Sequence, residues 1–339
     1  MNIVPDSRAR QPARAAWSLE QLRHWRAVAL GLSISTSTSL AYTSALQSWI
    51  EFCRLHNFAT EPTVESISFY IVFMSFHIKP QSVASYLSGI CNQLEAYFPD
   101  VRASVSHPVV RKTLAGMRRL RGTEQRRVDA ISIDQVRDAV GSLGESTHHD
   151  DRLFLAIFLT AFFGLMRIGE LCWPDRTELQ DPRRLTWRHT AQLTDNSYNF
   201  VLPASKTDRY YEGARIVIQR LDGVENPVTP FARYVDARDT AFPYHPELWL
   251  RLDGTVPKYS WFSSRLASLF PDAPNVGTHS LRAGGATRMA ELGASSDLIQ
   301  AAGRWSSETF KIYIRKNPVI LQSMLFGRPA FQDLQTHTR

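Results

Sequence analysis

Hydrophobic residues recur at three- and four-residue intervals through the first third of the chain, with polar residues between them. This spacing is typical of amphipathic helices and predicts them over residues 39–55, 64–76, 83–98 and 108–120. Pro62 and Pro80 stand near two predicted helix starts, where the missing N–H of proline costs little. Residues 17–121 are therefore predicted to form a small all-helical bundle. Its aromatic residues, which we expect mostly in the core and otherwise facing a bound partner, are Trp49, Phe52, Tyr70, Phe73, Tyr86 and Tyr97.

The pattern stops on both sides of this bundle. Residues 1–16 contain Pro5, Pro12 and three arginines and show no apolar periodicity, which predicts a flexible arm. Residues 122–130 are strongly polar and predict a linker between two domains.

Beyond the linker, the pattern becomes mixed. It predicts a helix over residues 133–143 and a buried helix over the almost unbroken apolar run 153–163. Residues 198–202 and 214–218 are typical of two strands joined by a polar turn. We therefore expect a mostly α chain with a small β-sheet, in which residues 131–322 form the mixed domain.

The last third of the chain contains residues that suit an anion. His279 and Arg282 stand three residues apart on one side of a helical turn, so that two donors converge. Gly303-Arg304-Trp305 follows, and Tyr313 lies within residues 308–314, which are typical of a short amphipathic helix. The run resembles an anion clamp that faces a hydroxyl nucleophile, although each part alone is also common in cores and on surfaces.

Two further basic residues precede this group. Arg167 follows the apolar run and would be costly to bury without an anion, so it either pairs with Glu170 or reaches a ligand phosphate. Lys206 lies in the polar turn between the two predicted strands, where a lysine is ordinarily solvated.

In order, the chain offers an arginine after a buried helix, a lysine on a hairpin, His-x-x-Arg, Gly-Arg-Trp and a tyrosine. This order and spacing resemble the tyrosine recombinases, a family of site-specific DNA recombinases and integrases. The runs from Gly164 to Glu170, from His279 to Thr287 and from Gly303 to Trp305 look most like the recombinases of Cryptons and DIRS-type elements, which are mobile elements of eukaryotes. The resemblance covers most of the chain and is strongest from Ile131 to Phe326.

The resemblance implies both a fold and a set of catalytic roles. The fold would join an all-helical, SAM-like core-binding domain, residues 17–121, to a mixed α+β catalytic domain, and the two would close around duplex DNA. The implied catalytic set is Arg167, Lys206, His279, Arg282, Trp305 and Tyr313. The arginines would grip the scissile phosphate, the histidine and tryptophan would complete the pocket, the lysine would protonate the departing 5′ oxygen, and the tyrosine would attack.

Two positions depart from the family's usual pattern. Trp305 stands where many members have histidine, and an indole can donate one hydrogen bond but cannot shuttle a proton. We therefore expect Trp305 to act by hydrogen bonding and packing. Ala283 stands where bacterial members often repeat a histidine, which removes only a supporting contact.

The residue types suit this chemistry in their own right. A guanidinium is permanently charged and can bond two oxygens, and a phosphodiester needs its developing charge neutralised. A phenol of pKa about 10 is protonated at neutral pH, so attack requires a proton acceptor, for which His279 is a candidate. A phosphotyrosine conserves the ester bond, so we expect no need for ATP or metal. The sequence contains no Gly-x-x-x-x-Gly-Lys-Ser/Thr phosphate loop.

The cysteines and the histidine–aspartate run do not have the spacing of a metal site. The three cysteines, Cys53, Cys91 and Cys172, are too far apart for a zinc finger, and their odd number favours a reducing compartment without disulfides. The run from His148 to Asp151 is four consecutive residues, which rarely converge on one ion. We expect a solvated loop there, and no cofactor.

Charge points to a polyanionic partner. The formal net charge is +7, and between Arg111 and Arg127 the only acid is Glu124. This run is predicted to be the end of helix 108–120, whose apolar face would be Val109, Val110, Leu114 and Met117, and the start of the linker. The candidate DNA-binding residues are Arg111, Lys112, Arg118, Arg119, Arg121, Arg126 and Arg127. Phosphate contacts would make binding to double-stranded DNA salt dependent; a solvated face or a nuclear import signal is the alternative.

Within the C-terminal tail, residues 323–339, the stretch 324–331 is apolar for a terminus. We expect Leu325, Phe326 and Phe331 to dock on a neighbouring protomer, with packing on their own domain as the equal alternative. The resemblance implies a homo-oligomer, a dimer on one DNA site and a tetramer when two sites meet. No apolar run is long enough for a membrane span.

The predicted function is that of a site-specific recombinase or integrase of a mobile element. It would cut and rejoin DNA in the nucleus through a 3′-phosphotyrosine and a Holliday junction. Two alternatives stay open, a type IB topoisomerase-like activity that relaxes one duplex, and a domesticated DNA-binding protein without catalysis.

Overall fold

A computed structural model describes residues 15–122, 129–204, 208 and 212–305 of the chain. The chain forms two compact units, which divide between Gln125 and Arg126. This division lies inside the stretch 122–130 that was predicted as a linker.

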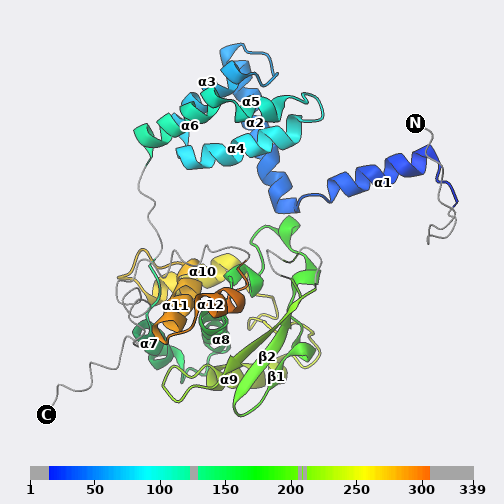
Figure 1. Cartoon of the computed structure of the whole chain (residues 1–339). Helices are drawn as coiled ribbons and strands as arrows, with labels where there is room; N and C mark the ends of the chain where they lie inside the picture. The colour runs from blue at the N-terminus through cyan, green and yellow to red at the C-terminus, as the bar shows by residue number, and fades with distance from the viewer. Residues whose placement is uncertain (1–14, 123–128, 205–207, 209–211, 306–339) are drawn as a thin grey trace. The chain divides into compact units, whose positions relative to one another are not determined.

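Helices make up the described part of the first unit. They are α1 (Leu19–Gly31), α2 (Thr36–His56), α3 (Val64–His77), α4 (Pro80–Leu94), α5 (Val101–Ser106) and α6 (Pro108–Arg121) (Figure 1). Local signals define their ends: the Thr63 side chain accepts from the Ser66 backbone N–H at the start of α3, and Asn57 takes a left-handed conformation after α2. Proline begins both α4 and α6. The four helices predicted in this region are therefore confirmed, with ends shifted by about a turn.

The core of this unit lies around Trp49 and Tyr70, both fully buried. The indole Nε1 of Trp49 donates to the carbonyl oxygen of Thr60 at 2.9 Å, and the Tyr70 hydroxyl donates to Ser48 at 3.0 Å. Burial raises the pKa of Tyr70 to about 12. Of the six aromatic residues predicted for this bundle, Trp49, Phe52 and Tyr70 are buried, and Phe73 and Tyr86 pack partly buried against them. Tyr97 is 77% exposed and is not part of the core.

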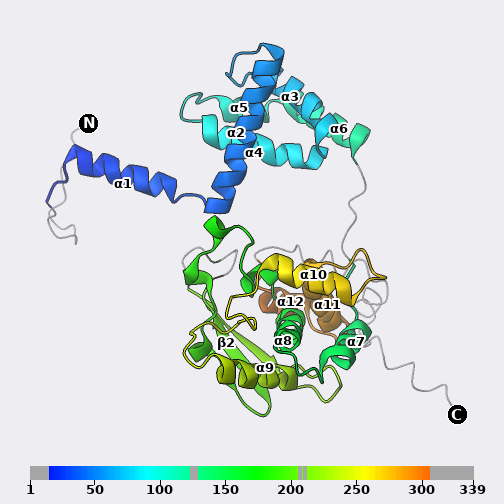
Figure 2. The same cartoon turned by 180° about the vertical axis from the view of Figure 1, so that it is seen from behind.

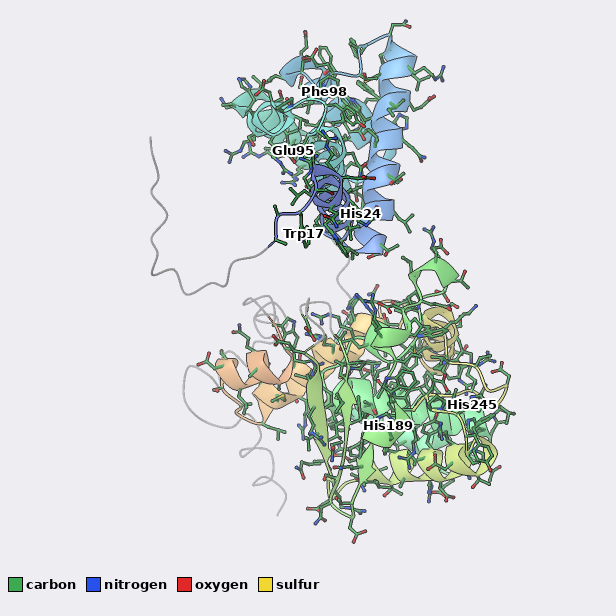
Figure 3. The ribbon with its side chains drawn as sticks, turned by 90° about the vertical axis from the view of Figure 1, so that its right-hand side faces the viewer. Trp17, His24, Glu95, Phe98, His189 and His245 are labelled. Carbon is green, nitrogen blue, oxygen red and sulfur yellow. The ribbon has the colours of Figure 1, made fainter. Side chains whose placement is uncertain are left out.

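Helix α1 buries none of its residues. Figure 3 labels Trp17 and His24 in this region; Trp17 immediately precedes the Ser18 cap of α1, and both side chains are exposed. Figure 3 also labels Glu95, which follows α4 and forms two hydrogen bonds with Arg102, at 2.7 and 2.6 Å.

The second unit combines helices with a small sheet. Its helices are α7 (Ile133–Leu143), α8 (His149–Phe163), α9 (Val228–Ala241), α10 (Tyr259–Leu269), α11 (Thr278–Glu291) and α12 (Ser296–Ala302). Short 3₁₀ turns are η1 (Ile168–Glu170), η2 (Thr177–Leu179), η3 (Pro182–Arg184) and η4 (Arg188–Thr190). Its strands are β1 (Gln192–Leu193), β2 (Ser197–Leu202) and β3 (Ala214–Gln219).

Helix α8 is the central element of this unit. Nearly every residue from Leu153 to Phe162 is buried, as the apolar run predicts, because α7, α9 and α11 pack around it (Figures 1 and 2). The Thr160 hydroxyl lies 2.8 Å from the Tyr198 hydroxyl on β2, which ties the helix to the sheet.

The sheet is antiparallel throughout and has the order β1-β2-β3 among the described residues. Strand β2 buries alternate residues, Tyr198, Phe200 and Leu202, and β3 buries Ile216 and Ile218. Leu202 pairs with Ala214, so residues 203–213 connect the two strands. The two predicted strands are confirmed and pair with each other.

The run from His148 to Asp151 differs from its prediction. Residues 149–151 form the first turn of α8, and both His149 and Asp150 are buried. His149 Nε2 lies 2.9 Å from the Leu250 carbonyl oxygen, and Asp150 accepts from the Leu252 N–H at 2.7 Å. These residues therefore join the helix to the segment after α9, and a solvated loop was the wrong expectation. No group of three metal-binding side chains occurs among the described residues.

The same neighbourhood contains the two histidines labelled in this unit in Figure 3, His189 and His245. Their segments run side by side, since the Arg188 N–H donates to the Pro246 carbonyl at 2.7 Å. His245 Nδ1 lies 3.6 Å from the Glu247 carboxylate. Both histidines lie in segments that stabilise the unit, and neither belongs to the candidate site described below.

The fold class predicted from the sequence, mostly α with a small β-sheet, is confirmed. None of the helices in the described residues is long and apolar enough to cross a membrane.

Candidate active site

The site begins where α8 ends. Leu165 follows the Gly164 cap and has a φ of 49°, so the chain turns sharply out of the helix. The Met166 N–H still reaches the Ala161 carbonyl at 2.9 Å, which fixes the turn. Arg167 therefore emerges directly beside the C-terminal end of a buried helix.

Arg167 pairs with Glu170, one of the two alternatives that the sequence leaves open. The Arg167 Nη1 lies 2.9 Å from Oε1 of Glu170, and the Arg167 backbone N–H donates to Oε2 at 3.0 Å. The Glu170 side chain is 5% exposed, whereas that of Arg167 is 22% exposed. The pair holds the arginine in place and leaves part of its side chain accessible, so a phosphate contact stays compatible with it.

His279 and Arg282 lie on the first turns of α11, as their spacing predicts. They differ in burial, because His279 is exposed whereas Arg282 is 3% exposed. Two glycines allow α11 to pack this closely against its neighbours. A Cβ at Gly284 would lie 2.2 Å from the carbonyl oxygen of Ile131, which precedes α7, and one at Gly285 would lie 2.0 Å from the carbonyl oxygen of Phe162 on α8.

Arg282 joins the two halves of the site. Its Nη1 donates to the Leu165 carbonyl at 2.9 Å, and its Nη2 donates to the Gly303 carbonyl. These carbonyls belong to the turn after α8 and to the segment after α12. The two arginines predicted to grip one phosphate are therefore brought to the same turn, although they are far apart in sequence.

Trp305 contacts Arg282 through its ring. The Arg282 Cζ lies 4.2 Å from the centroid of the ring, a cation–π contact. Gly303 is required for this arrangement, since a Cβ there would lie 1.6 Å from the Trp305 ring. The packing role expected for Trp305 therefore has a geometric basis.

Arg304 belongs to the same cluster, and the sequence reasoning missed it. Its Nη2 lies 3.4 Å from Oε2 of Glu170, 3.4 Å from the Leu165 carbonyl oxygen and 3.2 Å from the Met166 sulfur. Burial, opposed by Glu170 and assisted by Arg167, lowers the pKa of the Arg304 guanidinium from its usual value. The signal in the sequence is the Gly-Arg-Trp run itself, in which Arg304 directly precedes the predicted Trp305.

Two predicted catalytic residues lie outside the described part of the chain. These are Lys206, in the connection between β2 and β3, and Tyr313. The roles of both stay predictions. The docking residues predicted in the tail, 323–339, are also outside it.

The basic residues of α6 form an exposed surface. The described members are Arg111, Lys112, Arg118, Arg119 and Arg121, all exposed; Arg126 and Arg127 lie outside the described residues. Arg121 places its Cζ 4.3 Å from the ring of Phe76 on α3. The apolar face of α6 is narrower than predicted, because Val110 and Met117 are buried but Val109 is 49% exposed.

The described site is a cluster of cations held by one carboxylate. Arg167, Arg282 and Arg304 surround the turn after α8, and Glu170 pairs with two of them. One carboxylate shared by Arg167 and Arg304 leaves these two guanidinium groups with a net positive charge. The arrangement therefore suits a ligand that carries negative charge, such as a phosphate.

Comparison with known proteins gives similarity of structure but not of sequence. No protein-family model matches the chain, and no curated protein matches it in sequence. Solved structures that are similar include the XerH site-specific recombinase bound to palindromic difH substrate, with a TM-score of 0.60, 14% identity, and coverage of 84% of this chain and 78% of that chain.

Two further similar structures come from integrases. A Tn1549 transposon integrase in complex with transposon right end DNA gives a TM-score of 0.54 at 14% identity and covers 87% of this chain and 91% of that chain. A lambda integrase tetramer bound to a Holliday junction gives 0.54 at 13% identity and covers 87% and 76%. At such identities the similarity concerns the fold alone, and the chain has the fold of the tyrosine recombinases.

Proposed function

We propose that the protein is a site-specific DNA recombinase or integrase that breaks and rejoins DNA through a covalent phosphotyrosine. The observation that carries the proposal is the convergence of Arg167 and Arg282. These residues were chosen from sequence order, and the Arg282 guanidinium binds the carbonyl of Leu165, two residues before Arg167. The fold shared with XerH and the integrases supports the same function.

The proposed reaction exchanges one phosphoester for another. The Tyr313 oxygen forms a bond to phosphorus, and the bond from phosphorus to the 5′ oxygen breaks. The phenol proton passes to His279, directly or through water, and Lys206 gives a proton to the departing 5′ oxygen. The arginines neutralise the charge that grows on the non-bridging oxygens, which is the largest demand of phosphoryl transfer. The 3′-phosphotyrosine keeps the energy of the ester, so a second 5′ hydroxyl can reverse the reaction.

The proposal extends to the biological setting. The motif runs around Arg167, His279 and Gly303 support a recombinase of a eukaryotic mobile element of the Crypton or DIRS type, acting in the nucleus on double-stranded DNA. We propose a dimer on each DNA site and a tetramer at a Holliday junction. The lambda integrase structure named above is itself a tetramer on such a junction.

A nicked DNA substrate tests the proposal. In a duplex nicked just beyond the cleavage site, attack releases the short fragment that carries the free 5′ hydroxyl, so the reaction cannot reverse. The covalent complex then accumulates and migrates slowly on a denaturing gel. Tyr313→Phe should lose this band while still binding the same DNA. A band that persists in Tyr313→Phe would remove the tyrosine from its role. Relaxation of supercoiled DNA without any product joining two sites would instead indicate a topoisomerase, and DNA binding without any adduct would indicate a domesticated binding protein.

A further inference from the structure

Arg304 is a partly buried cation whose hydrogen bonds to oxygen acceptors are all 3.2 Å or longer. Its contacts to protein acceptors measure 3.2 Å to the Ala302 carbonyl and the Met166 sulfur, and 3.4 Å to the carbonyls of Gly164 and Leu165 and to Glu170. Charge-assisted hydrogen bonds are ordinarily about 2.7–2.9 Å. The Nε of Arg304 is buried and has no hydrogen-bond partner among the described residues. The guanidinium is therefore only weakly satisfied by the protein.

The backbone holds Arg304 in an unfavourable conformation. Its φ is 54°, in the left-handed region that residues with a Cβ avoid. Such strain persists only where the surroundings enforce it, and it is concentrated at functional sites. Here Gly303 and Trp305 sit on either side, and the Trp305 N–H donates to the Gln300 carbonyl at 3.1 Å. The turn directs the Arg304 side chain back toward Glu170.

The local charge favours one more anion. Arg304 and Arg167 both bind Glu170, and Arg304 and Arg282 both donate to the Leu165 carbonyl. Together these four side chains carry three positive charges and one negative charge. Removing a guanidinium from water is costly unless an anion compensates it. Arg167 and Arg304 share the single carboxylate of Glu170, so a phosphodiester at this place would supply a second negative charge for these two guanidinium groups.

We propose that Arg304 is a third arginine of the phosphodiester site and that it binds a non-bridging oxygen together with Arg167 and Arg282. In this assignment Trp305 acts by holding Arg282 with its ring. Arg304 then supplies the hydrogen-bond donor that was predicted for Trp305. The inference rests on the proposed function, because it takes a DNA phosphate as the ligand.

The competing explanation is a purely structural one. Arg304 also donates to the carbonyls of Gly164 and Leu165, so it holds the turn that follows α8. Loss of the side chain would then misplace Arg167 without any direct contact to DNA. The two explanations differ in one respect. A contact to a charged oxygen ceases to matter when that oxygen is removed from the substrate, whereas a contact to the turn matters with every substrate.

A methylphosphonate substrate distinguishes them. Replacing one non-bridging oxygen of the scissile phosphate by a methyl group makes the group neutral. On ordinary DNA, Arg304→Gln, which keeps a donor for the carbonyls but loses the charge, should slow formation of the covalent complex about 100-fold. On the methylphosphonate, the same variant should come within roughly ten-fold of the unmodified protein. Arg304→Lys, which keeps the charge, should fall between the two on ordinary DNA.

Arg238 provides a matched control. It is also a buried arginine, and it donates to the carbonyls of Glu247 and Phe242 in a part of the unit away from these residues. Arg238→Gln should lower the melting temperature and slow both substrates by the same factor. An Arg304→Gln defect that is equally large on both substrates would overturn the third-arginine assignment, and so would an absence of any defect on ordinary DNA.

The same experiment separates the inference from the proposed function. If the unmodified protein forms no covalent complex with ordinary DNA, the proposed function fails, and the assignment of Arg304 fails with it. If the complex forms but the methylphosphonate gives no rescue, only the assignment fails. If Arg304→Gln has a melting temperature well below that of the unmodified protein, Arg304→Lys is tested in its place. The methylphosphonate should again reduce the defect of this variant, and equal defects on the two substrates would again contradict the assignment.

Discussion

At the scale of single residues, the site depends on two left-handed backbone conformations. Leu165 has a φ of 49° and Arg304 one of 54°, and neither is glycine. Each costs about 1 kcal/mol or more relative to an ordinary conformation. The two turns place the Leu165 carbonyl where Arg282 and Arg304 both reach it. The strain is thus located at the point where the cationic side chains meet.

Gly285 is the residue whose size matters most for this meeting. Gly285→Ala would place a Cβ 2.0 Å from the Phe162 carbonyl oxygen, which belongs to the backbone of α8 and cannot move cheaply. We expect a loss of about 1–3 kcal/mol in the free energy of unfolding, measured by urea denaturation. The control is Gly141→Ala on α7, where nothing lies within 4 Å of the added Cβ. That change should stabilise by roughly 0.5–1 kcal/mol, and equal effects at both positions would contradict the close approach of α11 to α8.

Lys206 carries the prediction with the clearest chemical test. We propose that it is the general acid that protonates the 5′ oxygen, so Lys206→Ala should slow cleavage of ordinary DNA by about 100-fold or more. A 5′-bridging phosphorothiolate has a sulfur leaving group that needs no proton, and it should restore the rate. The rates come from the accumulation of covalent complex on denaturing gels. A variant that stays equally slow on the sulfur substrate would remove Lys206 from the acid role.

At the scale of elements, α6 carries the basic surface. Arg111 and Arg118 stand two helical turns apart, as do Lys112 and Arg119, so that the four form adjacent lines along an exposed face. Val110 and Met117 are buried on the other side. The helix therefore presents these four charges together on one exposed face.

Neutralising this face should weaken DNA binding in a salt-dependent way. Replacing Arg111, Lys112, Arg118 and Arg119 by Gln should reduce the slope of log K against log salt by about 3–4, close to 0.9 for each phosphate that the protein no longer neutralises. The measurement is a titration of DNA binding at several salt concentrations. Arg54→Gln is the control, since Arg54 is exposed on α2 but already paired with Glu51 at 2.6 Å. An unchanged slope would mean that the face is only solvated or serves nuclear import.

The helices show which structural features a local sequence pattern can predict and which it cannot. Helices α3 and α6 could be predicted because their periodicity and caps lie within the sequence of each helix, and α8 because an apolar run of its length must be buried. The first turn of α8 was misjudged because His149 and Asp150 are satisfied by backbone atoms of residues 250 and 252, a contact that no local pattern shows.

The candidate site likewise contains residues that the sequence predicts and one that it does not. Arg167, His279 and Arg282 could be predicted from the order of the motifs, because that order is visible without knowledge of the fold. Arg304 was not predicted because its place in the site depends on contacts with residues 164–170. Its left-handed backbone conformation is also not marked by a glycine in the sequence. Positions defined by distant partners need the structure.

At the scale of the whole molecule, the protein consists of two units, and we expect it to act in a larger assembly. The units divide at Gln125 and Arg126, so the basic face of α6 and the cationic cluster belong to different units. We expect the tail, residues 323–339, to link protomers. Deleting Ser323 to Arg339 should leave binding to a single DNA site intact but reduce tetramers on paired sites, as measured by native gels and analytical ultracentrifugation. Unchanged assembly and strand exchange would show that the tail packs on its own domain.

The proposed mechanism requires that Tyr313 becomes covalently attached to a DNA 3′ phosphate. The direct measurement is peptide mass spectrometry of the complex trapped on nicked DNA, after nuclease digestion has reduced the DNA to its last nucleotide. We predict a peptide containing Tyr313 that carries a 3′-linked nucleotide, with a free 5′ hydroxyl on the released strand. An adduct on another residue, a 5′ linkage, or no adduct from an enzyme that still binds DNA would contradict this claim.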